Sequence, residues 1–180
     1  MPSRSRTLFA WLTFAAISCC FPAAGNGEDV ALHDYVLSQV DGKETNLAPY
    51  KGRILVVEMF ATWCPPCRKD LPEIAALQAG YPTDKVAFVA VSADGASETL
   101  PALPKFLKEM DLKIPVLVGG GIFVDRFAGV DKPGGRQVLL PETYVFDGAG
   151  EIVARYVGEN KNKKKSLTDQ LDRMIKGEAK

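Results

Sequence analysis

Residues 53–60, with the sequence RILVVEMF, constrain the fold more than any other part of the chain. The segment is almost continuously apolar and rich in β-branched residues, which is typical of a central strand covered on both faces. Glu58 is its one acidic residue. Residues 61–72, ATWCPPCRKDLP, follow at once and place two prolines between two cysteines. Whatever the fold, a cysteine pair must therefore lie at the end of a buried strand.

The segments that come next alternate between helix and strand patterns. We predict a helix from Pro65 to about Ala79, because prolines are tolerated in a first helical turn, and Pro72 should kink it. Residues 85–94 (KVAFVAVSAD) predict a second buried strand, and residues 98–110 (ETLPALPKFLKEM) lead into a second helix. Such an alternation implies a parallel sheet with right-handed crossovers.

Shorter elements flank this unit on both sides. Residues 30–53 predict an N-terminal ribbon of two strands, because Asp41-Gly42 is a hairpin signal. Residues 143–158 predict two further strands about a glycine-rich turn, and a final amphipathic helix is expected near residues 167–175. A chain of 180 residues suits one globular domain plus a leader.

The stretch between these parts is less regular. A short helix is predicted near Ile122–Phe127, and the triple glycine at 119–121 is interpreted as a flexible turn, because no P-loop lysine or GxGxxG pattern accompanies it. Residues 129–137 (GVDKPGGRQ) predict a glycine- and proline-rich loop. The basic stretch 161–165 is interpreted as a solvated loop and helix entry rather than a docking patch.

The first 24 residues have the layout of a secretory signal. Arg4 and Arg6 precede an apolar run from Leu8 to Phe21, and small residues follow it. Two other readings stay open: the run is about long enough for a short uncleaved membrane anchor, and the sequence before Cys19 weakly resembles a lipobox. In each case we expect the protein to work in the periplasm or otherwise outside the cytoplasm.

The numbers of cysteines and charged residues limit the kinds of functional site that the chain can form. Two of the four cysteines belong to the leader, which leaves Cys64 and Cys67. A disulfide across two residues would be a poor structural staple, because so short a loop removes little unfolded-state entropy. Zinc prefers four ligands, and the rest of the chain adds only His33, which we expect at the surface. The 22 basic residues are balanced by 22 acidic residues, so the net charge does not indicate a nucleic-acid-binding protein.

The spacing of the cysteines suits thiol-disulfide exchange. With Cys64 just before the predicted helix and Cys67 one turn inside it, both side chains fall on one face and can close a disulfide. The helix N-terminus favours the thiolate of Cys64 by lowering its pKa. Cys64 would then attack a partner disulfide and Cys67 would resolve the mixed disulfide, and the same pair run backwards oxidises dithiols.

The motif FATWCPPCRKDLP after a β-run resembles the active site of the TlpA/ResA-like thiol-disulfide oxidoreductases in the thioredoxin superfamily. The resemblance covers roughly residues 30–176. It implies an α/β thioredoxin-like fold, with a central mixed sheet flanked by helices, an N-terminal β-ribbon and an inserted strand-helix element. The expected organisation is a signal peptide or anchor at 1–24 and a thioredoxin-like domain at 25–180.

The resemblance also implies roles for two acids near the cysteines. Glu58, six residues before Cys64, stands where related proteins often carry a buried acid that passes a proton to or from Cys67. The alternative is a strand-end charge that reaches solvent. Asp70 stands where the subfamily often has glutamate, so its shorter side chain puts a relay role in doubt. It is a possible modulator or a helix-surface carboxylate, and Pro72 matches a structural proline.

A substrate-binding surface is implied on the same grounds. Pro141 matches the cis-proline that lies against the cysteine pair, and its neighbour would share in offering backbone groups to an extended partner segment. Trp63 would form an apolar rim, unless it packs in the core. The stretch DKPGGRQVL lengthens the approach to Pro141 and is expected to reshape this surface. The implied substrate-binding residues are Trp63, Pro65, Pro66, Leu140 and Pro141.

The resulting functional prediction is an extracytoplasmic protein-disulfide oxidoreductase that acts as a reductant. The resemblance implies substrates such as apocytochrome c or copper-site cysteines, a membrane thiol-transport protein as electron donor, no cofactor beyond the Cys64–Cys67 disulfide, and a monomer that binds no nucleic acid. Two alternatives stay open. A thiol peroxidase would share the fold, although MFATWC lacks the usual Pro/Thr loop. A copper-binding chaperone would be expected to show CxxxC spacing and a distal histidine.

Overall fold

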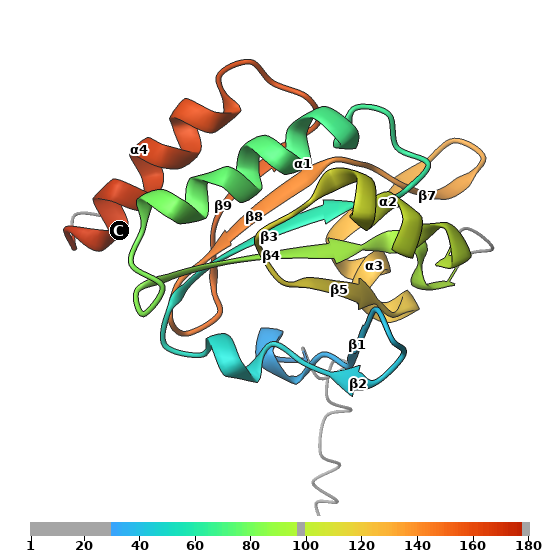
Figure 1. Ribbon diagram of the computed structural model, residues 1–180, viewed down its shortest axis with the longest axis horizontal. Helices are drawn as coiled ribbons and strands as arrows, with labels where there is room; N and C mark the ends of the chain where they lie inside the picture. The colour runs from blue at the N-terminus through green and yellow to red at the C-terminus, as the bar shows by residue number, and fades with distance from the viewer. Residues whose placement is uncertain (1–29, 97–99, 178–180) are drawn as a thin grey trace, which may run out of the picture.

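A seven-stranded mixed sheet forms the centre of the protein, and the computed structural model describes residues 30–96 and 100–177. The predicted leader at 1–24 lies outside these residues. The strand order is β2-β1-β5-β4-β3-β8-β9, with helices on both faces (Figure 1). The strands of this sheet are β1 (Leu37–Gln39), β2 (Glu44–Thr45), β3 (Ile54–Phe60), β4 (Val86–Ser92), β5 (Val116–Gly119), β8 (Glu142–Phe146) and β9 (Ile152–Val157).

The predicted central strand is confirmed. β3 runs parallel to β4 along its whole length and antiparallel to β8 on its other edge. Six of its seven residues are buried, because helices cover both faces of the sheet at this position. The parallel pairing extends to β4 and β5, whereas β8 and β9 form the predicted antiparallel pair. The sheet is therefore mixed, as the thioredoxin-like resemblance implied.

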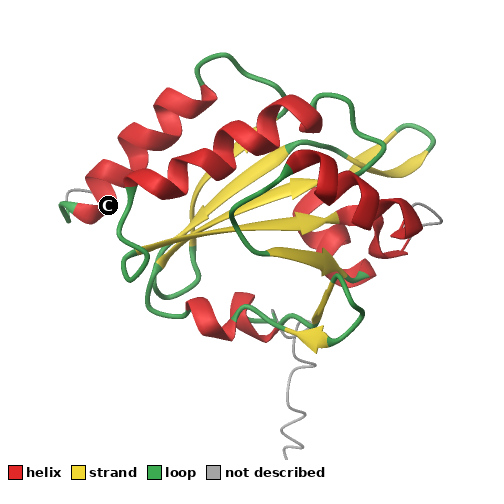
Figure 2. Cartoon of the chain, in the orientation of Figure 1, coloured by secondary structure: helices red, strands yellow, loops and turns green. Residues whose placement is uncertain are grey.

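Within the described residues, four α-helices flank the sheet, and Figure 2 colours them red together with the 3₁₀ turns. In Figure 1, α1 and α4 lie side by side across one face, and α3 lies behind the strands. Several 3₁₀ turns connect the elements, and one of them, Leu77–Gly80, continues α1 where the sequence predicted α-helix. The helices are α1 (Cys67–Ala76), α2 (Leu103–Met110), α3 (Gly121–Ala128) and α4 (Lys163–Ile175), and the other 3₁₀ turns are Leu32–Asp34, Ala48–Tyr50, Ala93–Ala96 and Leu100–Ala102.

The triple glycine is not a flexible turn. Gly119 ends β5 and Gly121 begins α3, so the segment joins a strand directly to a helix. A Cβ atom on Gly119 would lie 3.0 Å from Val124 Cγ2 and 3.2 Å from Val91 Cγ1. Glycine is therefore needed here for close packing between the strand and the helix that follows it.

The predicted loop at 129–137 is a β-hairpin instead. β6 (Gly129–Lys132) pairs antiparallel with β7 (Gly135–Val138) in a separate two-stranded sheet. Gly134 and Gly135 have φ angles of +99° and +114°, which only glycine adopts readily. The glycines and proline that favoured a loop in the sequence are thus the turn of a hairpin that leads into Pro141.

Two side chains predicted at the surface are buried. His33 is 5% exposed, and its imidazole packs so closely on Gly150 that a Cβ there would lie 3.0 Å from Cε1. Lys163, in the middle of the basic stretch 161–165, is 1% exposed, whereas the residues around it are exposed. α4 also begins four residues before the predicted start, so Lys163 is its first residue.

Candidate active site

The two cysteines lie in the connection between β3 and α1 and form a disulfide. Their sulfur atoms are 2.06 Å apart and their Cα atoms 5.3 Å apart. Cys67 is the first residue of α1, and the prediction that it lies one turn inside the helix is wrong. Cys67 is fully buried, whereas Cys64 is 4% exposed and is followed by the exposed Pro65. Cys64 is therefore the more accessible residue of the pair.

The start of α1 provides a polar contact to the outer sulfur. The backbone N–H of Cys67 donates a hydrogen bond to Cys64 Sγ at 3.3 Å. Once the disulfide is reduced, this N–H and the helix N-terminus would both favour negative charge on Cys64. The local geometry thus assigns the two sulfurs different environments, with Cys64 at the helix N-terminus and Cys67 enclosed.

Asp94 fixes the loop that carries the cysteines, a role that no sequence pattern indicated. Thr62 donates to its carboxylate through the backbone N–H at 2.9 Å and through Oγ1 at 2.8 Å. Ser92 Oγ donates to the same carboxylate at 2.7 Å. Asp94 lies just after β4, so these bonds hold the loop after β3 against the end of its neighbouring strand.

Pro141 follows a cis peptide bond, as predicted. It immediately precedes β8, in which Glu142 stands opposite Met59 of β3. The cis peptide therefore lies at the same end of the sheet as the cysteine loop. The Pro141 carbonyl accepts a hydrogen bond from the N–H of Gly158 at 2.8 Å. This carbonyl is already in use, while Leu140 is half-buried beside it.

Trp63 is 48% exposed, so the core-packing alternative is wrong. It borders a pocket of about 260 Å³ next to the cysteine loop. In this pocket Arg68 lies over the ring of Phe106, with its guanidinium 4.7 Å from the ring centroid, and pairs with Glu109 at 3.2 Å. The pocket combines an aromatic surface with charges of both signs.

Glu58 is buried inside the protein rather than reaching solvent at a strand end. Its side chain is 1% exposed. Thr143 Oγ1, on the neighbouring strand β8, donates a short hydrogen bond to Glu58 Oε2, and Lys163 Nζ lies 3.4 Å from Oε1. Asp70, one turn after Cys67 on α1, also interacts with Glu58. The carboxyl of Glu58 therefore lies beneath the first turn of the helix that carries Cys67.

Burial raises the pKa of Glu58 from 4.5 to about 8, as its predicted role requires. The Lys163 ammonium opposes this rise, the Asp70 carboxylate adds to it, and the Thr143 hydrogen bond opposes it more weakly. A carboxyl with such a pKa can hold a proton at neutral pH and can also release it. It is therefore suited to exchange a proton with a nearby thiol.

Lys163 completes this group, and the sequence analysis missed it. Its Nζ contacts the carboxylates of both Glu58 and Asp70. A signal for its burial was present, because the buried Lys163, Leu167 and Leu171 are spaced four residues apart and form one face of α4. We call Glu58, Asp70, Lys163 and Thr143 the buried cluster.

Other kinds of site are not found in the part of the chain that is described. Residues 30–96 and 100–177 contain no group of three or more His, Cys, Asp or Glu side chains that could hold a metal ion. Among the helices of those residues, none is long and apolar enough to cross a membrane.

Comparisons with known proteins agree with this chemistry. The family described as Redoxin matches residues 22–171. The chain is 29% identical over 143 residues to the thiol-disulfide oxidoreductase ResA of Bacillus thuringiensis subsp. konkukian, covering 79% of this chain and 73% of that protein. It is 31% identical over 140 residues to the thioredoxin-like protein YneN of Bacillus subtilis, covering 77% of this chain and 75% of that protein.

A solved structure extends the likeness to the fold. The crystal structure of a thiol:disulfide interchange protein of the thioredoxin family from Chlorobium tepidum TLS superposes with a TM-score of 0.61 at 27% identity. The superposition covers 83% of this chain and 98% of that one. The thioredoxin-like arrangement predicted from the cysteine motif is therefore confirmed.

Proposed function

Because the chain belongs to the Redoxin family and is a ResA-like thiol-disulfide oxidoreductase of the thioredoxin superfamily, we propose that it reduces disulfides in partner proteins outside the cytoplasm. Cys64 is the nucleophile, Cys67 is the resolving thiol and Glu58 exchanges the proton of Cys67. The proposed reaction needs no cofactor beyond the Cys64–Cys67 pair.

The single observation that carries this proposal is the asymmetry of the pair. Cys64 lies at the helix N-terminus beside an exposed proline, whereas Cys67 is fully enclosed in the helical turn whose Asp70 interacts with the buried Glu58. In the reducing direction the Cys64 thiolate attacks the partner disulfide and releases one partner sulfur as a thiolate. Cys67 then gives its proton to Glu58 and attacks Cys64, which releases the second partner sulfur and closes the Cys64–Cys67 disulfide.

The partner surface would lie around Cys64. Trp63 and the exposed Pro65 form its rim, and Pro66 is half-buried beside them. An extended partner segment would pair with the backbone at Leu140, because the carbonyl of Pro141 is bonded to Gly158. The hairpin of β6 and β7 leads directly into this segment and would add to the surface that the partner contacts.

The location and partners follow from the leader pattern and from the chemistry of reduction. The apolar run from Leu8 to Phe21 after two arginines supports export to the periplasm, with or without retention as an anchor. A reductant in an oxidising compartment must be re-reduced, so a membrane thiol-transport protein is its electron donor. Apocytochrome c and copper-site cysteines are the proposed substrates, and Asp70 is a proposed modulator.

Two cysteine variants test the reaction directly. We expect Cys64→Ser to abolish insulin-disulfide reduction, because no nucleophile remains at the exposed position. Cys67→Ser should instead accumulate mixed disulfides, which non-reducing electrophoresis detects. Normal turnover by either variant would contradict the two-cysteine mechanism. Hydrogen peroxide consumption by the reduced protein would favour the peroxidase, and stoichiometric copper in purified protein would favour the copper carrier.

A further inference from the structure

Two ionisable members of the buried cluster, Asp70 and Lys163, have no part in the thiol-disulfide exchange described above. The side chains of Lys163 and Glu58 are each 1% exposed, whereas that of Asp70 is 11% exposed and reaches solvent. Burying an ammonium and two carboxyls costs free energy unless they compensate one another. An arrangement this costly at the base of the cysteine helix requires an explanation beyond packing.

The charges of the cluster allow it to hold one exchangeable proton. It contains two carboxyl groups, Glu58 and Asp70, and one ammonium, Lys163. The cluster is neutral when one carboxyl carries a proton and has a charge of −1 when neither does. Glu58 interacts with both Asp70 and Lys163, so the protonation of Glu58 depends on both of these neighbours.

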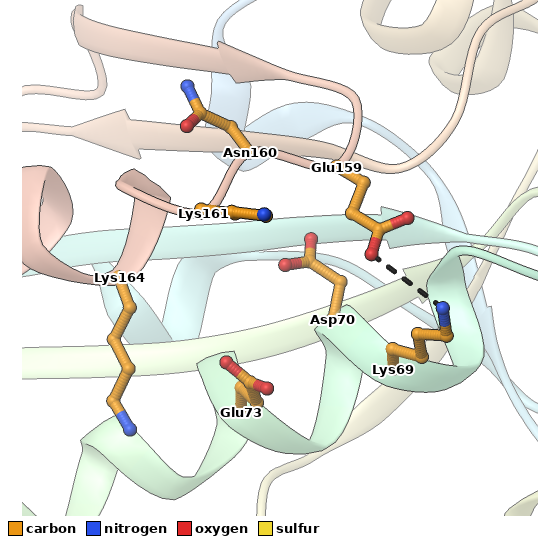
Figure 3. Close-up of a pocket in the computed structure, with 7 residues that line it drawn as sticks. All are labelled: Lys69, Asp70, Glu73, Glu159, Asn160, Lys161 and Lys164. Atoms are coloured by element: carbon orange, nitrogen blue, oxygen red, sulfur yellow. Dashed lines mark ion pairs between the residues drawn. The ribbon is translucent and has the colours of Figure 1, made fainter.

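A polar pocket joins this cluster to solvent. Figure 3 shows Asp70 pointing from α1 into a pocket between that helix and the start of α4. The pocket has a volume of about 290 Å³, and an ion pair between Lys69 and Glu159, 3.8 Å apart, crosses it. The residues that line it are Lys69, Asp70, Glu73, Glu159, Asn160, Lys161 and Lys164. Every residue of this lining is charged or polar, and the pocket is large enough for several water molecules.

The position of this pocket differs from that of the partner surface. Partner proteins would meet Cys64 and Trp63, on the loop before α1, whereas the pocket opens beside the side of α1 that faces α4. Cys67 is fully buried, and a bound partner would further close the loop above it. A proton that leaves Cys67 during a mixed disulfide therefore needs another way to water.

We propose that Asp70 and Lys163 form a proton outlet, which takes the proton of Cys67 from Glu58 to the pocket between α1 and α4. The inference rests on the proposed reductase function and adds a route for its proton. Lys163 is a positioning residue, because its ammonium holds both carboxyls together. It also offsets the shorter reach of aspartate at position 70, where glutamate was expected from the resemblance.

The proposed step conserves atoms and charge. In the mixed disulfide, the Cys67 thiol gives its proton to the Glu58 carboxylate, and the Cys67 sulfur attacks Cys64 Sγ. The Cys64–Cys67 bond forms, the bond from Cys64 to the partner sulfur breaks, and the partner leaves as a thiolate. Glu58 then passes the proton to Asp70, and Asp70 releases it to water in the pocket. The cluster returns to its starting charge.

The groups that face Glu58 come from every element packed on it. Lys163 comes from α4, Asp70 from α1, and the Thr143 hydroxyl from β8. On the remaining side its register partner in β4 is Ala90, which has no charge. Removing Lys163 should therefore raise the pKa of Glu58, and removing the Asp70 charge should lower it, because these two groups act on it in opposite directions.

A single-turnover reaction with Ellman's reagent separates the outlet from the function it serves. Attack by Cys64 on the reagent releases a first thionitrobenzoate, and attack by Cys67 on the mixed disulfide releases a second. The first release tests the nucleophile, whereas the second depends on the proton of Cys67. If the first release fails in the wild-type protein, the proposed function is wrong; a normal first release with an altered second one concerns the outlet alone.

We expect Lys163→Met to move the pH midpoint of the second release upward by about 1–3 units. Asp70→Asn should move it downward and also lower the plateau at high pH by about tenfold or more, because the proton acceptor at the pocket is gone. Asp70→Glu should restore the plateau to within about twofold. Lys163→Gln, which keeps a hydrogen-bond donor without the charge, repeats the test if the methionine variant does not fold.

Lys165→Met is the matched control. Lys165 is also in the first turn of α4, but its side chain is 78% exposed and pairs with Asp169 at 2.6 Å. Neither release should change in this variant. An Asp70→Asn protein whose midpoint moves while its plateau stays at the wild-type value would overturn the outlet, and an unmoved midpoint in both Lys163 variants would overturn the positioning role.

Discussion

Two buried glutamates on neighbouring strands have opposite surroundings. Glu142 of β8 is fully enclosed and accepts two hydrogen bonds from Arg155, one from Nη2 at 2.6 Å and one from Nε at 3.2 Å. The hydroxyl of Tyr144 donates a third at 2.8 Å. Glu58 of β3 has one ammonium, which it shares with Asp70. The guanidinium of Arg155 thus binds the Glu142 carboxylate through two hydrogen bonds, whereas Glu58 shares its ammonium with a second carboxylate.

The two acids also lie on opposite faces of the sheet. Glu58 stands opposite Thr143 in the register, and side chains alternate along a strand, so the preceding residue, Glu142, points to the other face. That face carries an aromatic group in which Phe127 contacts Tyr144 and Phe146. One face of β8 thus anchors the fold, and the other adjoins the cysteine helix. Burial alone therefore does not make a carboxyl group a proton carrier.

The largest effect is expected from breaking the anchored pair. Arg155 is itself 43% exposed, but Arg155→Ala leaves the buried Glu142 carboxylate without its cation and should lower the free energy of unfolding by about 3 kcal/mol. Urea denaturation measures this loss. The pH dependence of thionitrobenzoate release should keep its wild-type midpoint, and a shifted midpoint would show that the two acids are coupled.

A pH series on the oxidised protein tests the other acid. The pKa of Glu58 is raised in the fold from 4.5 to about 8, so its contribution to stability is fully present below pH 4.5 and is lost as the pH rises toward 8. Between pH 4.5 and 7 this loss is about 3 kcal/mol. Glu58→Gln, which stays neutral, should remove that slope in urea denaturation. An unchanged slope in the variant would mean that another group titrates.

The same Glu58→Gln variant should be slower in turnover. Without a carboxylate to accept the proton of Cys67, insulin-disulfide reduction at pH 7 should fall by about 100-fold. Glu142→Gln keeps the shape of the acid on the opposite face and serves as the control, with a smaller kinetic effect expected. Equal losses in both variants would indicate that the fold, rather than proton exchange, is affected.

The smallest effect on stability is expected at the exposed rim. Trp63→Ala removes a side chain that is 48% exposed, so the free energy of unfolding should change by less than about 0.5 kcal/mol. The Michaelis constant for a disulfide-bearing protein should nevertheless rise severalfold, because partners lose an apolar contact beside Cys64. A severalfold rise with a small disulfide reagent as well would place the effect on the cysteine itself.

Sequence patterns predicted most of the helices and strands, and they singled out two of the four residues of the buried cluster, Glu58 and Asp70. The apolar run of β3 has only one position that needs an explanation, which is why Glu58 could be singled out. Pro141 could be predicted as cis because the resemblance supplied its context. These residues lie in regular elements whose period and spacing can be read along the chain.

The remaining features depend on contacts between distant segments. Lys163 stands 93 positions from Asp70, and a run of lysines resembles a solvated surface until the face of α4 is known. Asp94 supports the cysteine loop from the end of another strand. The β6–β7 hairpin was predicted as a loop, because its turn residues outweigh its short strands in any local pattern.

The reduction potential of the Cys64–Cys67 couple tests the central claim most directly. Equilibration with dithiothreitol or glutathione buffers, followed by thiol trapping, gives the value. We expect a potential near the thioredoxin end of the range, about −270 mV, because the protein is proposed to donate electrons. A value near the oxidising DsbA end, about −120 mV, would contradict the reductant and favour an oxidase built on the same cysteine pair.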